Sequence, residues 1–419
     1  MAEETTGKSA VSLIAGNLKS EDVKLKPQIS LFRMLIEQHY QRSIRLNEMT
    51  GKAEYLDELT GQWHEWNDAR DSQMRAYFQE QYGIYNPKML DDALSIHLAA
   101  NTVNPVVQKL KSIKWDGKPR VEQFLHDVMK CEDNDYTREC SRLIFSGGVH
   151  RAFEPGCKFD SMIVLIGRQG CGKSTICRWL SMDESYFREI KTISNKEGIE
   201  AVRGCWIGEV AELMAMTRVK ETEAVKAYIT TQTDSYRPPY AKHVVTIPRR
   251  CVFIGTTNNA QFLTDKTGNR RFFPVDCNNS SVDALNAHAK EVKEYIEQAW
   301  AEAVQLYKDG NLLPFPRVDL MADIEKAQDD ATEDDYRIGQ IEQYLTDMKQ
   351  AKNARVSVIE LWHRAFNEPE ESKPTRKDSI EITQIMCNMP GWRRSKTKMQ
   401  TPWGRQKCFE RHDPYFPRW

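Results

Sequence analysis

The segment Gly167–Ser174 has the residue types and spacing of a phosphate-binding turn. Gly167 and Gly172 enclose four residues, and Lys173 and Ser174 follow at once. Glycines let successive backbone N–H groups point toward one anion, and the start of a following helix adds partial positive charge. The lysine can reach the β- and γ-phosphates of a nucleoside triphosphate, and the serine hydroxyl can ligate Mg²⁺.

This turn is therefore predicted to bind ATP and Mg²⁺. An apolar run, 162–166, leads into it and a helix-compatible segment, 175–180, follows, which is the context that such a turn needs. The alternative is a glycine turn with a solvated lysine. The residues predicted to bind the nucleotide are Gly167, Gly170, Cys171, Gly172, Lys173, Ser174 and Thr175.

Hydrolysis of ATP also needs a carboxylate that organises the metal and the attacking water. The apolar run "CWIGEVAEL" places Glu209 at the end of a predicted strand and Glu212 one helical turn later. Ligands of open α/β folds lie at the carboxyl ends of the strands. Glu209 is therefore the first candidate for catalysis and, with Ser174, for the metal, and Glu212 is the second. Either could instead be a surface glutamate.

Two further motifs offer groups that could contact a γ-phosphate. The run "CVFIGTTN" ends in Asn258, whose amide could bond the phosphate or the attacking water, although Asn is also common in any turn after a strand. Arg270 and Arg271 precede the apolar run "FFPVD". A solvated pair is one interpretation. The other is an arginine finger, which reaches ATP on a neighbouring subunit and makes hydrolysis depend on oligomer formation.

The elements that must position these residues are predicted from periodicity. Short apolar runs between about 160 and 277 alternate with helical segments, which is typical of a parallel α/β sheet. Residues 28–130 have apolar residues at helical spacing, and a long helix is predicted over 283–308. After 338, three short helices and a basic, glycine-containing hairpin have the element order of a winged-helix module.

These patterns divide the chain into five segments. They are a flexible tail (1–27), a helical N-terminal or collar region (28–135), an α/β domain with the phosphate-binding turn (136–320), an acidic connector (321–337) and a basic winged-helix-like domain (338–419).

Composition excludes several classes of protein. Of the 419 residues, 40% are hydrophobic and 28% are charged, and no apolar stretch is long enough to cross a bilayer. The N-terminus has acidic residues where a signal peptide needs positive charge. Ten cysteines occur without a CxxC pair or zinc spacing. We therefore expect a cytoplasmic protein with reduced thiols and no membrane partner.

The C-terminal segment is basic although the whole chain has a net charge of −1. Residues 372–419 contain eleven Lys and Arg residues and four acids, a local charge of +7, with Trp392, Trp403 and Phe409 among them. Such a patch could bind the DNA backbone through counterion release. The alternative is a solvated surface. The candidate DNA contacts are Arg393, Arg394, Lys396 and Lys398.

Seven motifs in one order resemble the virulence-associated protein E family, prophage and mobile-element ATPases that are similar to superfamily 3 helicases. They cover most of residues 46–308 and read "NEMTGKAEY", "WDGKPRVEQFL", the phosphate-binding turn, "GEVAEL", "VKAYITTQTDSYRPPY", "GTTNNAQFLTDKTGNRRFFPV" and "EQAWAEAVQLY". The resemblance implies an AAA+-like core that assembles into a ring, expected to be a hexamer, with ATP between subunits.

By position, the resemblance also implies roles for single residues. Lys173 and Ser174 match the Walker A residues, Glu209 matches the Walker B position and Asn258 matches sensor 1. Arg270 or Arg271 matches the finger. Many superfamily 3 proteins have two adjacent acids at the Walker B strand end, whereas here Val210 and Ala211 separate Glu209 from Glu212. This departure leaves the division of catalytic and metal roles between the two glutamates open.

Superfamily 3 helicases also carry a β-hairpin before the sensor strand, and its tip enters the central pore. The segment "RPPYAKHVVTIPRRCVFIGTTN" has that placement, and Lys242 and His243 resemble the Lys-His pair at the tip in papillomavirus and polyomavirus helicases. A cation there can pair with phosphates, and an imidazole can donate or stack. Without the resemblance, a solvated hairpin lysine would be the preferred interpretation.

The resemblance implies an ATP-dependent DNA helicase or translocase that acts on single-stranded or forked DNA during replication of a prophage or mobile element. Two alternatives remain. One is a DNA-binding ATPase switch, such as an initiator, a loader or a phage-interference factor, that does not unwind DNA. The other is a phosphate-loop enzyme with a small substrate. No metal-binding acidic pattern of a primase is found in residues 1–130, so primase activity is not assigned.

Overall fold

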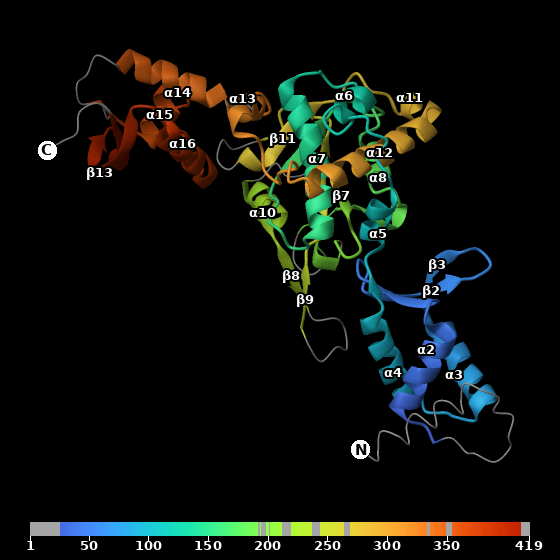
Figure 1. The fold of residues 1–419 in the computed structure, drawn as a ribbon. Coiled ribbons are helices and arrows are strands. Elements are labelled where there is room, and N and C mark those ends of the chain that lie inside the picture. Colours follow the sequence, from blue (N-terminus) through green and yellow to red (C-terminus); the bar gives the residue numbers. More distant parts are fainter. Residues whose placement is uncertain are drawn as a thin grey trace. The chain divides into compact units, whose positions relative to one another are not determined.

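The structure, a computed structural model, describes residues 26–191, 193, 198–200, 202–211, 219–236, 244–263, 269–332, 336–348 and 354–411. The chain divides into two compact units, residues 1–331 and 332–419, which we call the first unit and the C-terminal unit (Figure 1). Of the predicted tail over 1–27, only residues 26 and 27 lie within the described residues.

A five-stranded sheet forms the centre of the first unit. The strand order is β11-β5-β10-β7-β6, and all pairs are parallel, which confirms the predicted α/β class. The three middle strands are buried along their whole length, as expected when helices cover both faces of a sheet. The strands are β5 (Met162–Ile166), β6 (Phe187–Glu189), β7 (Ile207–Val210), β10 (Val252–Thr257) and β11 (Phe272–Asp276).

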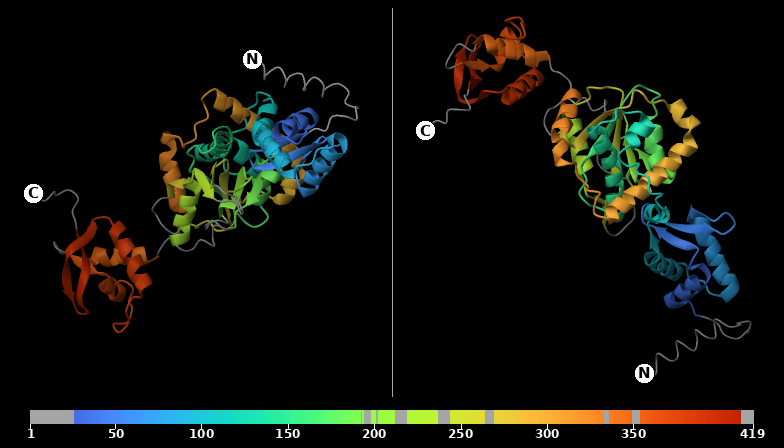
Figure 2. Two further views of the ribbon diagram at one scale, coloured as in Figure 1. Left: turned by 90° about the horizontal axis from the view of Figure 1, so that it is seen from below. Right: turned by 45° about the horizontal axis from the view of Figure 1, so that its top comes forward.

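Helices cover the two faces of this sheet (Figure 2). One face packs on α7 (Asp135–Phe153), α8 (Lys173–Leu180) and α12 (Ala289–Lys308) around a shared core that contains Trp206 and Trp300. The other face packs on α10 (Val219–Thr230), where the rings of Tyr228 and Phe253 lie 5.2 Å apart. The two cores fix the sheet and therefore the strand ends from which the predicted site residues project.

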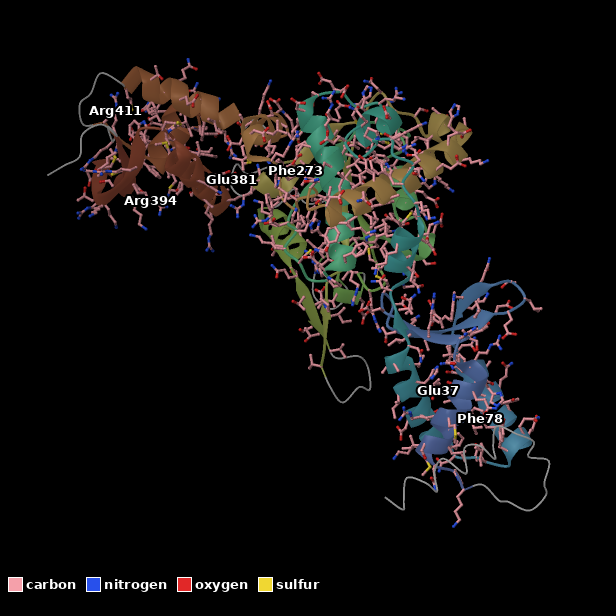
Figure 3. The ribbon with its side chains drawn as sticks, viewed as in Figure 1. Glu37, Phe78, Phe273, Glu381, Arg394 and Arg411 are labelled. Carbon is pink, nitrogen blue, oxygen red and sulfur yellow. The ribbon has the colours of Figure 1, made fainter. Side chains whose placement is uncertain are left out.

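The N-terminal part of the first unit contains a small sheet in addition to the helices that periodicity predicts. α2 (Ile29–Tyr40), α3 (Asp68–Tyr82) and α4 (Pro87–Ala100) surround a core that contains Phe78 (Figure 3). A four-stranded sheet, ordered β3-β2-β1-β4, accompanies them. Its strands are short and mostly polar, so they carry little apolar alternation to predict them. They are β1 (Ile44–Asn47), β2 (Lys52–Asp57), β3 (Gln62–Glu65) and β4 (Thr102–Val103).

The predicted acidic connector over 321–337 begins instead with a helix, α13 (Met321–Asp330). Leu320 and Ile324, four residues apart, are buried against the core, and Gln328 Nε2 donates to the carbonyl oxygen of Phe272 at 2.9 Å. α13 thus covers the free edge of β11. The segment is acidic overall, so its composition does not indicate the apolar face that stabilises it as a helix.

The remaining elements of the first unit are shorter. They are α5 (Pro105–Ser112), α6 (Phe124–Met129), η1 (Glu184–Tyr186), β8 (Thr233–Tyr236), β9 (Val245–Pro248), η3 (Asn269–Arg271), α11 (Val282–Ala287) and η4 (Val318–Leu320). β8 and β9 form an antiparallel hairpin apart from the central sheet. Within the described ranges, no helix combines the length and the apolar character that a bilayer crossing requires.

The C-terminal unit contains the three predicted helices and the predicted basic hairpin. Its sheet order is β12-β14-β13, with antiparallel pairs, and β12 is a strand that periodicity did not predict. The core contains Leu361, Ile382 and Phe409. The elements are α14 (Tyr336–Asp347), β12 (Arg355–Ser357), α15 (Val358–Arg364), α16 (Arg376–Asn388), β13 (Trp392–Thr401) and β14 (Gly404–Arg411).

All ten cysteines lie among the described residues and carry free thiols. Eight are buried, Cys157 is partly buried and Cys387, on α16, is exposed. Burial raises the pKa of the Cys140 and Cys177 thiols, because a thiolate loses hydration inside the protein. These buried thiols are therefore poor nucleophiles.

Candidate functional site

The candidate site begins with the turn between β5 and α8. Gly170 and Gly172 adopt positive φ angles of 83° and 92°, a region that favours glycine. A Cβ atom at Gly172 would lie 2.3 Å from Leu285 Cδ1, so this position also lacks room for a side chain. Val282 N donates to the carbonyl oxygen of Gly170 at 2.8 Å, which anchors the turn on the segment after β11. The turn is thus held in one backbone shape just before the first residue of α8.

The ammonium group of Lys173 lies over this turn. Its Nζ donates to the carbonyl oxygens of Gly167 at 2.5 Å and Arg168 at 3.2 Å, and to Asn258 Oδ1 at 2.9 Å. Cys171 Sγ lies 3.6 Å from the same nitrogen. Lys173 is 9% exposed, so its charge acts in a partly desolvated setting where it is screened less than on the surface. The structure therefore brings Lys173 and Asn258 together.

Glu209 lies beside the start of α8. Ser174 Oγ donates to Glu209 Oε1 at 2.6 Å, and Thr256 Oγ1 donates to the same oxygen at 2.8 Å. Glu209 is 2% exposed. The two hydroxyls hold a buried carboxylate in a fixed orientation at the carboxyl end of the sheet. Burial and the neighbouring Glu209 charge together raise the pKa of the Cys177 thiol on α8.

Thr256 is a site residue that the sequence analysis missed. It lies on β10 two residues after Ile254, which pairs with Glu209, so alternation along the strand turns Thr256 to the same side of the sheet as Glu209. β10 pairs with both β5 and β7, and Ile254 lies opposite Ile163 and Glu209. The alternation was the available signal, because residues i and i+2 of a strand share one face.

Oxygen donors dominate the site, which suits a hard cation. Ser174 and Glu209 offer a hydroxyl and a carboxylate within one hydrogen bond of each other. Mg²⁺ is usually bound by one or two protein oxygens together with phosphates and water. No cluster of three or more His, Cys, Asp or Glu side chains is found in the part of the chain that the structure describes. The chemistry of the donors therefore fits magnesium that arrives with a phosphate ligand.

Arg270 and Arg271 are not brought to this turn within one chain. They belong to η3, directly before β11, whereas the turn follows the end of the parallel neighbour β5. The five residues of β11 separate the two ends of the sheet by about 17 Å. Arg270 is exposed and Arg271 is partly buried.

Three predicted residues lie outside the described residues, namely Glu212, Lys242 and His243. The strands β8 and β9, which flank the last two, are described.

The basic hairpin β13–β14 is a separate candidate interface. Lys398 lies directly opposite Lys407, and both are exposed. Like charges opposite each other destabilise a sheet, so an anion that binds there relieves the repulsion. Lys396 lies in the irregular stretch between Arg394 and Lys398 and is exposed, and the exposed side chain of Arg394 extends into solvent (Figure 3).

Other residues of this hairpin are less available than the sequence suggests. Arg393 donates through Nε and Nη2 to Glu410 Oε1, at 3.0 and 2.8 Å, so its charge is partly neutralised. A hydrogen bond from Ser395 and the Arg393 guanidinium lower the pKa of Glu410. Phe409 is 3% exposed and belongs to the core, and Trp403 stacks on His363 at 4.6 Å. Phe409 therefore offers no flat face to a ligand.

A family profile described as the virulence-associated protein E-like domain matches residues 110–336. The chain belongs to this family. The virulence-associated protein E-like domain includes the turn after β5, Glu209, Asn258 and the arginines of η3, and it ends before the basic hairpin. The resemblance of the motifs to this family is thus confirmed.

Solved structures add a likeness of fold. The A form apo structure of the NrS-1 C terminal region, residues 305–718 of that protein, has a TM-score of 0.52 and 12% sequence identity, and the match covers 90% of this chain and 98% of that one. Another apo structure of the same region has a TM-score of 0.49 and 13% identity, with 87% and 95% covered. No curated protein matched the chain.

Proposed function

We propose that this member of the virulence-associated protein E family is a Mg²⁺-dependent ATPase that works as a DNA helicase or translocase in replication of a prophage or mobile element. The observation that carries the proposal is a set of two hydrogen-bonded pairs at the start of α8, Lys173 with Asn258 and Ser174 with Glu209. Each has a role in this chemistry: the ammonium for phosphates, the hydroxyl for Mg²⁺, the carboxylate for water and the amide for the γ-phosphate.

The sheet supports a phosphate-loop core of the AAA+ type. β10, which leads into Asn258, lies between β5, which leads into the turn, and β7, which carries Glu209, so the carboxyl ends of three neighbouring strands lie at one edge of the sheet. In this core the turn is the Walker A loop, Glu209 is the Walker B acid and Asn258 is sensor 1. We expect ATP to bind between subunits of a ring, which we propose is a hexamer.

The remote position of Arg270 and Arg271 supports this oligomer. An arginine at the far end of the sheet can reach a γ-phosphate only when that phosphate belongs to another copy. In phosphoryl transfer an arginine supplied in trans stabilises the charge of the transition state. We therefore assign the arginine finger to one of these two residues.

The C-terminal unit supports DNA binding. Its element order, helix, strand, two helices and a two-stranded wing, is that of a winged-helix module, with Lys396, Lys398 and Lys407 on the wing. This unit is also the observation that favours the second candidate function, a DNA-binding ATPase switch that assembles on DNA without separating its strands.

Strand separation distinguishes the two functions. The test measures phosphate release with and without single-stranded DNA, and unwinding of a forked DNA, for the wild type and for a Lys242→Ala, His243→Ala variant. A translocase is expected to show ATPase activity that single-stranded DNA stimulates, and the variant is expected to lose unwinding while it still hydrolyses ATP. ATP hydrolysis by a wild type that does not unwind the fork would favour the switch. Unwinding that the double substitution leaves unchanged would remove Lys242 and His243 from strand separation, and no ATP hydrolysis by the wild type would contradict both functions.

The wing gives a prediction for DNA affinity. A Lys398→Gln, Lys407→Gln variant is expected to weaken DNA binding and to reduce the slope of log affinity against log salt concentration by about 1.8 for duplex DNA, since each phosphate contact contributes about 0.9. Fluorescence anisotropy between roughly 50 and 200 mM salt measures this slope. The matched control is Arg393→Gln, whose charge Glu410 already partly neutralises, so its slope should change less. An unchanged slope in the double variant would exclude Lys398 and Lys407 as DNA contacts.

A further inference from the structure

A buried ion pair closes the base of the β8–β9 hairpin. Arg249 follows β9 directly, and its Nε and Nη2 donate to Asp234 Oδ2 and Oδ1 at 2.7 and 3.0 Å. The two side chains are only 2% and 9% exposed. The guanidinium therefore binds both carboxylate oxygens at once, which fixes the angle between the two groups as well as their distance.

The same arginine also ties the hairpin to two other elements. Its Nη1 donates to the carbonyl oxygen of Tyr228 in α10, and its guanidinium carbon lies 4.3 Å from the centre of the Tyr228 ring. Its backbone N–H donates to the carbonyl oxygen of Gln232 at 2.8 Å, and its own carbonyl oxygen accepts from Gly156 N at 2.8 Å. The hairpin base is thus joined to the end of α10 and to the turn after α7.

A short path runs from this ion pair to the candidate ATP site. Only Arg250 and Cys251 separate Arg249 from β10, and β10 carries Thr256 and leads into Asn258. Thr256 bonds Glu209, and Asn258 bonds Lys173. β10 lies between two parallel strands and is buried along its length, so it transmits a displacement rather than absorbing it.

A gain in the folding stability of the protein does not explain why this ion pair is buried. Taking two charges out of water carries a desolvation cost that can exceed their attraction, and apolar side chains of similar volume often stabilise a fold as well or better. What a bidentate buried pair supplies is one defined geometry. A hairpin that must follow the state of the ATP site needs this property, because a loose base would let the hairpin move independently.

We propose that Asp234 and Arg249 are positioning residues that couple the ATP site to the β8–β9 hairpin. The proposal rests on the proposed function. The hydrogen bonds of the two side chains go to each other and to Tyr228, and none goes to the turn after β5, so β10 is the most direct path from the pair to ATP. When Asn258 and Thr256 shift with the nucleotide, the ion pair makes the β8–β9 hairpin and β10 rotate together as one rigid body. DNA bound to the hairpin affects hydrolysis by the same path in the opposite direction.

The test replaces the pair with apolar side chains of similar size, Asp234→Leu and Arg249→Met. Three quantities are measured: the unfolding temperature, phosphate release without DNA, and the stimulation of phosphate release by single-stranded DNA. We expect the variant to fold and to hydrolyse ATP without DNA, but its stimulation by DNA to fall at least about fivefold, as loss of coupling between two sites predicts. Unwinding of forked DNA should fall with it.

Two further variants keep the test decisive. Arg249→Lys retains the charge and loses the bidentate bond, so it is expected to fold and to show a partial loss of stimulation, and it replaces the double variant if that one does not fold. The control variant, Lys52→Gln with Glu65→Gln, removes an exposed ion pair between the strands of another hairpin, whose charged atoms lie 2.7 Å apart. It should leave the stimulation by DNA unchanged.

The outcomes separate the two proposals. If DNA does not stimulate the wild type, the proposed function fails and the coupling fails with it. If DNA stimulates the wild type and both Arg249 variants equally, the proposed function stands and the coupling role of the ion pair is overturned. A matching loss in the Lys52, Glu65 control would also overturn it, because the effect would not be specific to the buried pair.

Discussion

Replacement of Glu209 by glutamine is expected to slow ATP hydrolysis by roughly a hundredfold to a thousandfold, the usual effect of removing one preorganised polar group from a reaction centre. The amide keeps the size of the side chain and can still accept from Ser174 and Thr256. It cannot act as a base for the attacking water or balance the charge of Mg²⁺. Steady-state phosphate release measures the rate, and titration with a fluorescent ATP analogue should show that binding is retained.

The matched control is Glu302→Gln. Glu302 is another buried glutamate, 6% exposed, and its carboxylate accepts from the backbone N–H groups of Arg120 and Val121. Glutamine can still accept these bonds, so turnover should stay close to that of the wild type. Equal rates for the wild type and Glu209→Gln would remove Glu209 from the catalytic site, and the same substitution at Glu212 would then be the next experiment.

Loss of the arginine finger should have a comparable or larger effect. We expect either Arg270→Ala or Arg271→Ala to lower turnover by about a thousandfold or more, since an arginine supplied in trans is worth 10³ to 10⁵ in phosphoryl transfer. Both residues precede β11, so neither substitution touches the turn that holds the nucleotide. Phosphate release by each single variant identifies which arginine acts.

Mixing variants tests whether the arginine acts between copies. A Lys173→Ala protomer has no working ATP site but keeps its arginines, and an arginine variant has the opposite defect. Each should be inactive alone, whereas mixed oligomers should regain activity, because the Lys173→Ala protomer supplies the missing guanidinium to its neighbour. If both variants form oligomers together and activity does not return, the finger does not act in trans.

The candidate site could be predicted from the sequence because its residues lie at or near the ends of predicted strands. Parallel strands end at the same edge of a sheet, so the residues that follow or close three apolar runs must converge. The convergence is seen in the bonds from Lys173 to Asn258 at 2.9 Å and from Ser174 to Glu209 at 2.6 Å, across 85 and 35 residues of chain. Thr256 was within reach of the same argument through alternation along β10.

Other parts of the fold depend on contacts that no local pattern records. The short polar strands β1 to β3 gain their places from partners far along the chain, as when Asn47 Nδ2 donates to Tyr186 Oη across 139 residues. α13 is a helix because its apolar side packs on β11, which composition alone does not reveal. Arg270 and Arg271 lie far from the turn because β11 runs parallel to β5. This strand direction cannot be predicted from the sequence before the topology of the sheet is known.

The uneven burial of the thiols gives a direct route to a spectroscopic probe. Cys387 is the one cysteine of the ten that is exposed, and it lies on α16 beside the strand β13. A maleimide dye should attach there in the unmodified chain before it reaches the partly buried Cys157 and the eight buried sulfurs. Its emission would then follow events at the C-terminal unit in real time, without removal of any native cysteine.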